Sequence, residues 1–88
     1  MITKTLIIEN KMGLHARPAS LFVEQASQYD SDVIIGKDGI DVNGKSIMGI
    51  LMLAAECGDE VTLQVAGSDE EDAMQAFVDL LKGKFNEE

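Results

Sequence analysis

The sequence predicts a single α+β domain, residues 1–88, with its elements in the order β-α-β-β-α-β-α. Three observations indicate this class: short segments that alternate apolar and polar residues, longer segments with apolar residues at helical spacing, and an Asp-Gly pair between two short apolar segments. The first is typical of half-buried strands, the second of amphipathic helices and the third of a β-hairpin. One domain is expected because chains of this length rarely hold two independent cores.

The chain begins with a strand and continues into a helix. Segment Ile2–Ile8 places three apolar side chains on one face, and the polar, glycine-ended segment 9–13 ends the strand. From Ala16 the spacing of the apolar residues changes to that of a helix, which is expected to run to about Gln28. The apolar stripe of this helix consists of Ala19, Phe22, Val23 and Ala26.

A hairpin and a short apolar helix are expected next. Asp38-Gly39 lies between apolar segments at 33–35 and 40–42, which predicts two strands joined by a tight turn. Ser46 is the expected N-cap of a helix that is apolar on almost every side. A small domain cannot bury every side of such a helix, so part of it is expected at the surface. The members expected in the core are Ile50 and Leu53.

The last third of the chain predicts a strand and a helix. Residues 61–65 alternate strictly between apolar and polar, which is typical of a half-buried strand. Ser68 and Glu71 have the spacing of a capping box, and the acidic residues 69–72 suit the positive end of a helix. An apolar helical stripe follows, and Gly83 is expected to end that helix.

The composition argues against several classes of partner. Sixteen acidic and seven basic residues give a net charge of −9, which repels nucleic acids and anionic membranes. No apolar segment approaches the roughly 20 residues of a membrane helix, and the N-terminus lacks the pattern of a signal peptide. The single Cys57 cannot form a disulfide within the chain or a cysteine-based zinc site. The acidic excess lies in residues 56–88, with a charge of −8, whereas residues 1–55 are nearly neutral at −1.

The rarest residues of the chain lie together. It has one His, one Arg and one Pro, and all three fall within His15-Ala16-Arg17-Pro18. His15 is the expected N-cap of the helix, where the N–H groups of Ala16 and Arg17 have no helical partners. Such an end binds anions, and its partial positive charge favours a neutral, nucleophilic imidazole. Pro18 fits the first turn, where no N–H is needed.

These residue types favour phosphoryl transfer, in which an imidazole accepts the group and a guanidinium stabilises its equatorial oxygens. The same residues also have more ordinary interpretations. A lone histidine is more often structural or solvent-exposed, and a surface arginine is usually only solvated. A catalytic triad would need a nucleophile beside His15, but Ser20 lies one turn or more into the helix. Ligands for zinc are lacking, so no metal is expected.

Two motifs resemble a known family. Gly13-Leu14-His15-Ala16-Arg17-Pro18-Ala19-Ser20 and Asn43-Gly44-Lys45-Ser46-Ile47-Met48-Gly49-Ile50 resemble HPr, the histidine phosphocarrier of the bacterial phosphoenolpyruvate-dependent phosphotransferase system (PTS). The resemblance covers the whole chain, because length, element order and motif spacing agree. It implies an α+β fold of the open-faced β-sandwich type, in which a four-stranded antiparallel sheet of order 1-4-2-3 carries three helices on one face.

The resemblance also implies a route for the phosphoryl group. Nδ1 of His15 would take it from phosphorylated enzyme I and pass it to a histidine of an EIIA-type domain, with help from Arg17 and the Ala16 N–H. The protein would be a cytoplasmic, monomeric carrier without a cofactor, and not a turnover enzyme. The implied docking surface around His15 comprises Ala16, Ser20, Leu21, Val23, Ile47, Met48 and Leu51. Some relatives carry basic residues where this chain has Glu24 and Ser27, so weaker electrostatic steering of partners is expected.

Ser46 has two expected roles. As an N-cap it stabilises its helix by about 1 kcal/mol. By resemblance, it is also the serine that HPr kinase/phosphorylase modifies to slow the carrier and recruit a transcriptional regulator. A phosphate suits a helix N-terminus, but beside an apolar docking surface it discourages an acidic partner. The alternative function is a regulatory HPr paralogue, either nitrogen-related or a module that binds kinases or transcription factors, which does not feed sugar uptake.

Overall fold

The computed structural model describes residues 1–86 and confirms the predicted order of elements. One sheet contains four strands, β1 (Ile2–Ile7), β2 (Asp32–Lys37), β3 (Ile40–Asn43) and β4 (Glu60–Ala66). All neighbouring strands are antiparallel, and the order β1-β4-β2-β3 is the one that the resemblance implies. The central strand β4 pairs Leu63 with Lys4 of β1 and with Ile35 of β2, which sets the register of the sheet.

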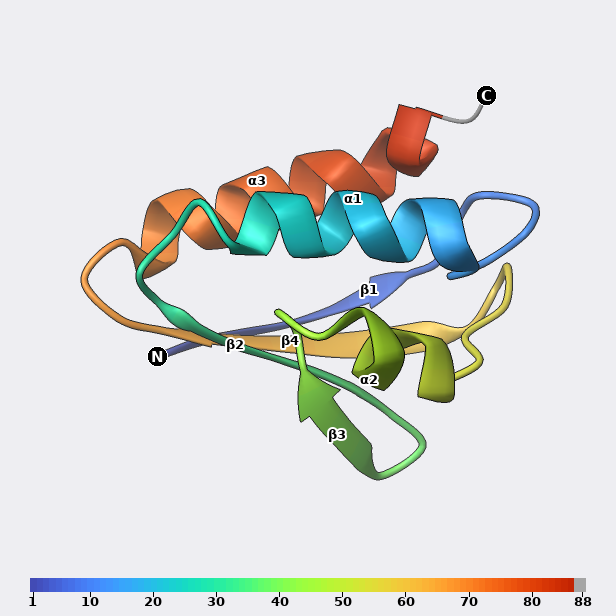
Figure 1. Ribbon diagram of the computed structural model, residues 1–88, viewed down its shortest axis with the longest axis horizontal. Helices are drawn as coiled ribbons and strands as arrows, with labels where there is room; N and C mark the ends of the chain where they lie inside the picture. Colours follow the sequence, from blue (N-terminus) through green and yellow to red (C-terminus); the bar gives the residue numbers. More distant parts are fainter. Residues whose placement is uncertain (87–88) are drawn as a thin grey trace.

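Within residues 1–86 the α-helices are α1 (Ala16–Ala26), α2 (Ile47–Met52) and α3 (Glu70–Lys82). Figure 1 shows α1 and α3 side by side over the sheet, with α2 close to β3. The α1 helix packs against both other helices, so it joins the helical layer together. It ends two residues earlier than predicted. The N–H of Gln28 bonds to the carbonyl of Gln25 at 3.2 Å, three residues back, so the chain forms a tighter turn there and the α-helix does not continue.

The predicted apolar faces meet in one core. In β4, Val61, Leu63 and Val65 are fully buried, whereas the alternating polar residues are not, which confirms the predicted strand. Phe22 of α1 and Phe77 of α3 stack with their ring centroids 4.6 Å apart. The predicted core members of the α2 region are also buried, Ile50 completely and Leu53 almost completely. The core therefore fixes α1 and α2 relative to each other.

The start of α3 differs from the prediction. No Ser68–Glu71 capping box forms, because the N-cap residue is Asp69 and the helix begins at Glu70. The Asp69 carboxylate makes no capping bond and instead accepts hydrogen bonds from the N–H groups of Asp30 at 2.8 Å and Ser31 at 3.0 Å, and from the Ser31 hydroxyl. These long-range bonds place the helix start one residue later than the local pattern predicts.

The chain after α3 contains a core residue that the sequence did not indicate. Gly83 ends the helix as predicted, and its N–H bonds to the Asp79 carbonyl at 2.9 Å. A short 3₁₀ turn, η1 (Lys84–Asn86), follows with positive φ at all three residues. L residues rarely adopt this conformation, and burial of the Phe85 side chain offsets its cost.

Candidate functional site

The loop before α1 holds His15 in place. The N–H of Leu14 donates to the carbonyl of Ala55 at 2.8 Å, which joins this loop to the segment after α2. The neighbouring Gly13 has a φ of +69°, and a Cβ there would collide with the same Ala55 carbonyl oxygen. Asn10, which is fully buried, donates from Nδ2 to the Gly13 carbonyl at 2.7 Å and closes the loop. The backbone leading to His15 is therefore held on both sides.

His15 is the N-cap of α1, as predicted. Its backbone is extended, with φ −85° and ψ −169°, and its carbonyl accepts the Ala19 N–H at 3.0 Å. The imidazole is half-buried and makes no capping hydrogen bond. Pro18 is buried in the first turn and has no N–H, so the first-turn donors are those of Ala16 and Arg17. Both donors lie at the positive end of the helix dipole, next to the imidazole.

Arg17 is exposed in the first turn of α1. Its guanidinium has no hydrogen bond or ion pair with another side chain or carbonyl among residues 1–86. Within this described range, no other group therefore competes for its N–H donors with an anion bound at the helix start. The structure thus places an imidazole, two backbone N–H groups and a guanidinium at one helix end.

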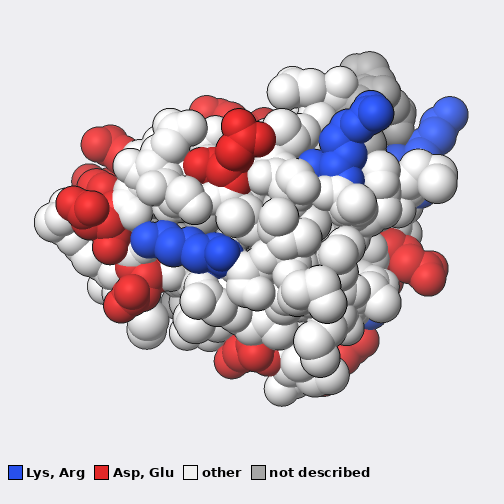
Figure 2. Space-filling model, viewed as in Figure 1, with Lys and Arg blue, Asp and Glu red and all other residues white. Residues whose placement is uncertain are grey.

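The seven residues of the expected docking surface differ in exposure. Ala16, Ile47 and Met48 are exposed, whereas Ser20, Leu21, Val23 and Leu51 are half-buried. Of the half-buried members, Leu21, Val23 and Leu51 also pack against the core. Contact between α1 and α2 brings the two halves of the set to one side of the molecule. Figure 2 shows that uncharged residues occupy the centre of this face, between basic side chains on either side.

Ser46 is the N-cap of α2, as predicted. Its Oγ accepts the N–H of Gly49 at 3.1 Å, and its carbonyl accepts the N–H of Ile50 at 3.1 Å. The residue is half-buried, next to the exposed Ile47 and Met48. A charge added to Ser46 would therefore lie beside the apolar side chains of the expected docking surface.

The C-terminal end of α2 is held by Lys37, which the sequence did not single out. Its Nζ lies 3.3 Å from the Leu53 carbonyl oxygen, 3.5 Å from that of Ala54 and 3.4 Å from the Asp59 carboxylate. The N–H of Glu56 donates to the same carboxylate at 2.8 Å and lowers the pKa of Asp59, with a further lowering from Lys37. No local pattern indicates this set, because its members come from separate segments.

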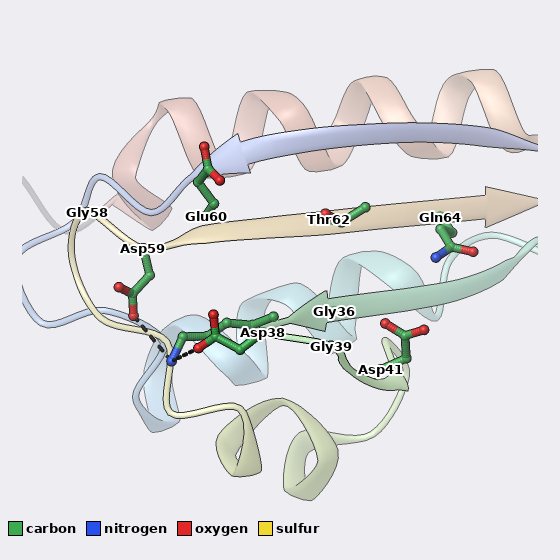
Figure 3. A pocket seen from close by; sticks show the side chains of 10 residues that line it. Gly36, Asp38, Gly39, Asp41, Gly58, Asp59, Glu60, Thr62 and Gln64 are labelled. Carbon is green, nitrogen blue, oxygen red and sulfur yellow. Dashed lines mark ion pairs between the residues drawn. The ribbon is translucent and has the colours of Figure 1, made fainter.

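The ion pairs of Lys37 with Asp38 and Asp59 lie at a hollow between the β2–β3 turn and β4 (Figure 3). Carboxylates, Thr62 and Gln64 line this hollow, which opens to solvent and does not include His15. Figure 3 shows the carboxylates spread along its length. The hollow is thus separate from the helix start that holds the imidazole.

Other site chemistries find little support within residues 1–86. In this range no group of three or more His, Cys, Asp or Glu side chains could hold a metal ion. Nor does any helix here have the length and apolar character needed to span a bilayer. Cys57 is exposed, with its Sγ 3.8 Å from the Glu9 carbonyl oxygen. The helix start at His15 is accordingly the best-defined candidate site.

Known proteins are similar to this chain in sequence and in fold. Residues 2–83 match the family model described as the PTS HPr component phosphorylation site. Phosphocarrier protein HPr of Treponema pallidum is 48% identical over 88 residues, which cover all of both chains. The crystal structure of HPr from Thermoanaerobacter tengcongensis superposes with a TM-score of 0.96 at 51% identity, covering 100% of this chain and 99% of the other.

A second type of relative is the catabolite repression protein Crh of Bacillus subtilis. Its crystal structure, described as a domain-swapped dimer, has a TM-score of 0.76 at 43% identity and covers 96% of this chain and 97% of the other.

The sheet order, the helices and the two motifs agree with the family match over nearly the whole length. The chain therefore belongs to the HPr family, the phosphocarrier proteins of the PTS.

Proposed function

We propose that the protein accepts a phosphoryl group on Nδ1 of His15 from phosphorylated enzyme I and donates it to a histidine of an EIIA-type domain. The observation that carries this proposal is the position of His15 as the N-cap of α1, with no capping bond from its side chain. The exposed Arg17 and the N–H groups of Ala16 and Arg17 stand at the same helix end. An imidazole placed there has anion-binding groups beside it.

In each transfer one P–N bond forms and another breaks. The lone pair of His15 Nδ1 attacks phosphorus, and the bond from phosphorus to the donor histidine of enzyme I breaks, returning its electron pair to that imidazole. The first-turn N–H groups and the Arg17 guanidinium bind the negatively charged phosphoryl oxygens during the transfer. In the second transfer His15 is the donor: the histidine of the EIIA-type domain attacks phosphorus, and the bond from phosphorus to His15 Nδ1 breaks. The protein therefore carries the group and turns over no substrate itself.

The partners dock on an apolar surface in this proposal. Its residues are those predicted around His15, with α1 contributing Ala16, Ser20, Leu21 and Val23 and α2 contributing Ile47, Met48 and Leu51. Exposed Met48 suits a surface that packs against more than one partner, because methionine is flexible. We place the carrier in the cytoplasm as a monomer. Analytical ultracentrifugation tests the oligomeric state, and a dimer as the main species would contradict this part of the proposal.

The decisive variant is His15→Ala, because the chain has no other imidazole. We expect it to accept no label from radiolabelled phospho-enzyme I, whereas Gln28→Ala, altered at an exposed residue just beyond α1, accepts label as the unaltered protein does. Circular dichroism checks that both variants fold. Full labelling of folded His15→Ala would show that the proposed acceptor is wrong.

Regulation at Ser46 forms a second part of the proposal. A kinase of the HPr kinase/phosphorylase type would phosphorylate Ser46, and the new charge would weaken enzyme I binding at the neighbouring apolar side chains. We expect Ser46→Asp to bind enzyme I more weakly than Ser46→Ala, which removes the cap but adds no charge. Isothermal titration calorimetry compares the two, and equal affinities would count against this mechanism.

A regulatory paralogue is the second candidate function, and the similarity to Crh favours it. In that case the same His15 would signal phosphorylation state to a kinase or to a transcriptional regulator without feeding sugar uptake. The two functions differ in which purified proteins accept the phosphoryl group from the charged carrier. Transfer to a sugar-specific EIIA domain favours transport, and transfer to a nitrogen-type EIIA domain alone favours regulation.

A further inference from the structure

Three methionines near the proposed docking surface are strongly exposed. The exposed fractions are 73% for Met12, 70% for Met48 and 76% for Met52. Apolar side chains of this size usually lie inside a small domain, so their exposure together requires an explanation. Only Met48 belongs to the docking residues that the sequence resemblance implies. The other two carry the same thioether group.

The three methionines belong to segments that border the phosphoryl site, namely α2, which as a whole packs against α1, and the loop before His15. Met48 and Met52 are four residues apart in α2 and therefore lie on one face of that helix. Met12 precedes His15 by three residues, so their Cα atoms lie within about 11 Å of each other. All three thioethers are accessible from solvent in the absence of a partner.

We propose that Met12, Met48 and Met52 are sites of reversible oxidation by hydrogen peroxide that switch off docking of the phosphocarrier's partners. This inference rests on the proposed function, because it assigns regulation to the same docking surface. In each reaction the thioether sulfur attacks one peroxide oxygen and the O–O bond breaks. The sulfur is oxidised to a sulfoxide, the peroxide is reduced and the other oxygen leaves as water.

Oxidation changes the surface from apolar to polar. Methionine is unbranched and flexible, which suits packing against several partners, whereas its sulfoxide is polar and chiral and disrupts such contacts. A docked partner would have to bury the sulfoxide oxygens without a designed hydrogen-bond donor. Because methionine sulfoxide reductases restore the thioether, the change is reversible.

The chain supplies its own comparison residues. Met1 is also 76% exposed, but Figure 1 places the N-terminus at the opposite end of the molecule from the start of α1. Met74 is only 2% exposed and lies in the core. Peroxide should thus oxidise Met1 without functional effect and should spare Met74, so loss of function can be attributed to the three methionines near the site.

The experiment uses full-length protein with Cys57→Ser, which removes the exposed thiol as a second target of peroxide. One sample keeps all methionines, a second has Met1→Leu and a third has Met12→Leu, Met48→Leu and Met52→Leu, which conserve apolar volume. Each is treated with hydrogen peroxide, and peptide mass spectrometry identifies the oxidised residues. The rate of phosphoryl transfer from radiolabelled phospho-enzyme I is measured at limiting concentration before and after treatment.

We expect peroxide to slow transfer at least about tenfold in the first two samples and to leave the triple-leucine sample unaffected. Treatment with a methionine sulfoxide reductase should restore the rate. Unchanged transfer by protein with confirmed oxidation at Met48 and Met52 would overturn the inference, as would an equal loss in the triple-leucine sample. Failure of untreated, folded protein to accept label would instead refute the proposed function, and the inference with it.

Discussion

At the scale of single residues, the position of His15 depends on neighbours that take no part in transfer. Gly13 combines a positive φ with a close approach to the segment after α2, so it accepts neither a side chain nor a different backbone angle at low cost. Leu14 then bonds to that same segment immediately before the imidazole. A disturbance at Gly13 therefore reaches His15 through a single intervening residue, Leu14.

Replacing Gly13 with alanine tests this dependence. A Cβ at Gly13 would collide with the Ala55 carbonyl oxygen and lie 2.8 Å from the Glu56 Cα, whereas one at Gly39, which has a φ of +82°, meets no atom within 4 Å. Gly39→Ala should cost about 1–2 kcal/mol of unfolding free energy for its backbone angle alone. We expect Gly13→Ala to cost roughly 1–3 kcal/mol more and to slow phosphoryl transfer. Urea denaturation and transfer rates provide the comparison, and equal behaviour of the two variants would argue against the steric account.

Arg17 is predicted to act on the transferred group and not on docking. Its guanidinium is exposed and offers a planar fork of donors, which a lysine ammonium does not reproduce. We expect Arg17→Ala to lower the single-turnover transfer rate by about a hundredfold, with a smaller loss for Arg17→Lys. Lys4→Ala, at an exposed residue of β1, is the charge control. If calorimetry showed that enzyme I affinity fell as much as the rate, Arg17 would be a docking residue instead.

At the scale of elements, α2 is too short to be stable alone, so groups at both ends matter. A six-residue helix is well below the length at which isolated helices persist in water. Ser46 caps its first turn, and Lys37 holds the carbonyls that follow its last turn. Of its apolar residues, Ile50 is buried, Leu51 is half-buried, and Ile47, Met48 and Met52 are exposed. Loosening either end should therefore affect docking as well as stability.

The end held by Lys37 can be tested with a variant that keeps the apolar stem. Lys37→Met removes the ammonium that contacts the Leu53 and Ala54 carbonyl oxygens. We expect the free energy of unfolding to fall by about 1 kcal/mol and the amides at the end of α2 to exchange hydrogen faster. Lys4→Met, which changes an exposed lysine of β1, should do neither. Hydrogen exchange followed by NMR checks this, and unchanged protection after Lys37→Met would exclude the bracing role.

Comparison of the elements shows which features the sequence could predict. The strand at 61–65 and the N-caps His15 and Ser46 were predictable, because their signals lie in adjacent residues. The start of α3 was not, since Asp69 has its hydrogen-bond partners in a distant turn. The Lys37 contacts and the burial of Phe85 also depend on residues that only the fold brings together. Local patterns thus located the imidazole and its helix, but not the contacts that hold them.

At the scale of the whole molecule, one acidic residue connects the two long helices. Asp69, at the start of α3, bonds to Asp30 and Ser31 in the turn that follows α1. Ser31 is fully buried, and Gly67 approaches it so closely that a Cβ at Gly67 would lie 2.6 Å from the Ser31 Cα. Part of the acidic excess therefore has a structural use, beyond the end of α1 opposite to the one that His15 caps.

The same contact makes the stability of the fold depend on pH. The Ser31 hydroxyl and the Asp30 N–H, as donors to the carboxylate, lower the pKa of Asp69 below that of an unfolded aspartate, which is about 3.9. A group whose pKa is lower in the folded state adds stability that is complete above the unfolded pKa. That contribution is lost as the pH falls through the lower, folded-state pKa.

Replacement of Asp69 by asparagine should remove this pH-dependent contribution. Relative to the unaltered protein, we expect Asp69→Asn to have a clearly lower Tm near pH 7, where the native carboxylate is fully ionised. The difference should shrink as the pH falls below 4, because the native Asp69 then also loses its charge. Glu71→Gln removes a charge from the first turn of the same helix and should change Tm little at either pH. Thermal denaturation followed by circular dichroism from pH 2.5 to 7 measures these differences, and a Tm gap for Asp69→Asn that stays constant over this range would show that its ionisation does not contribute.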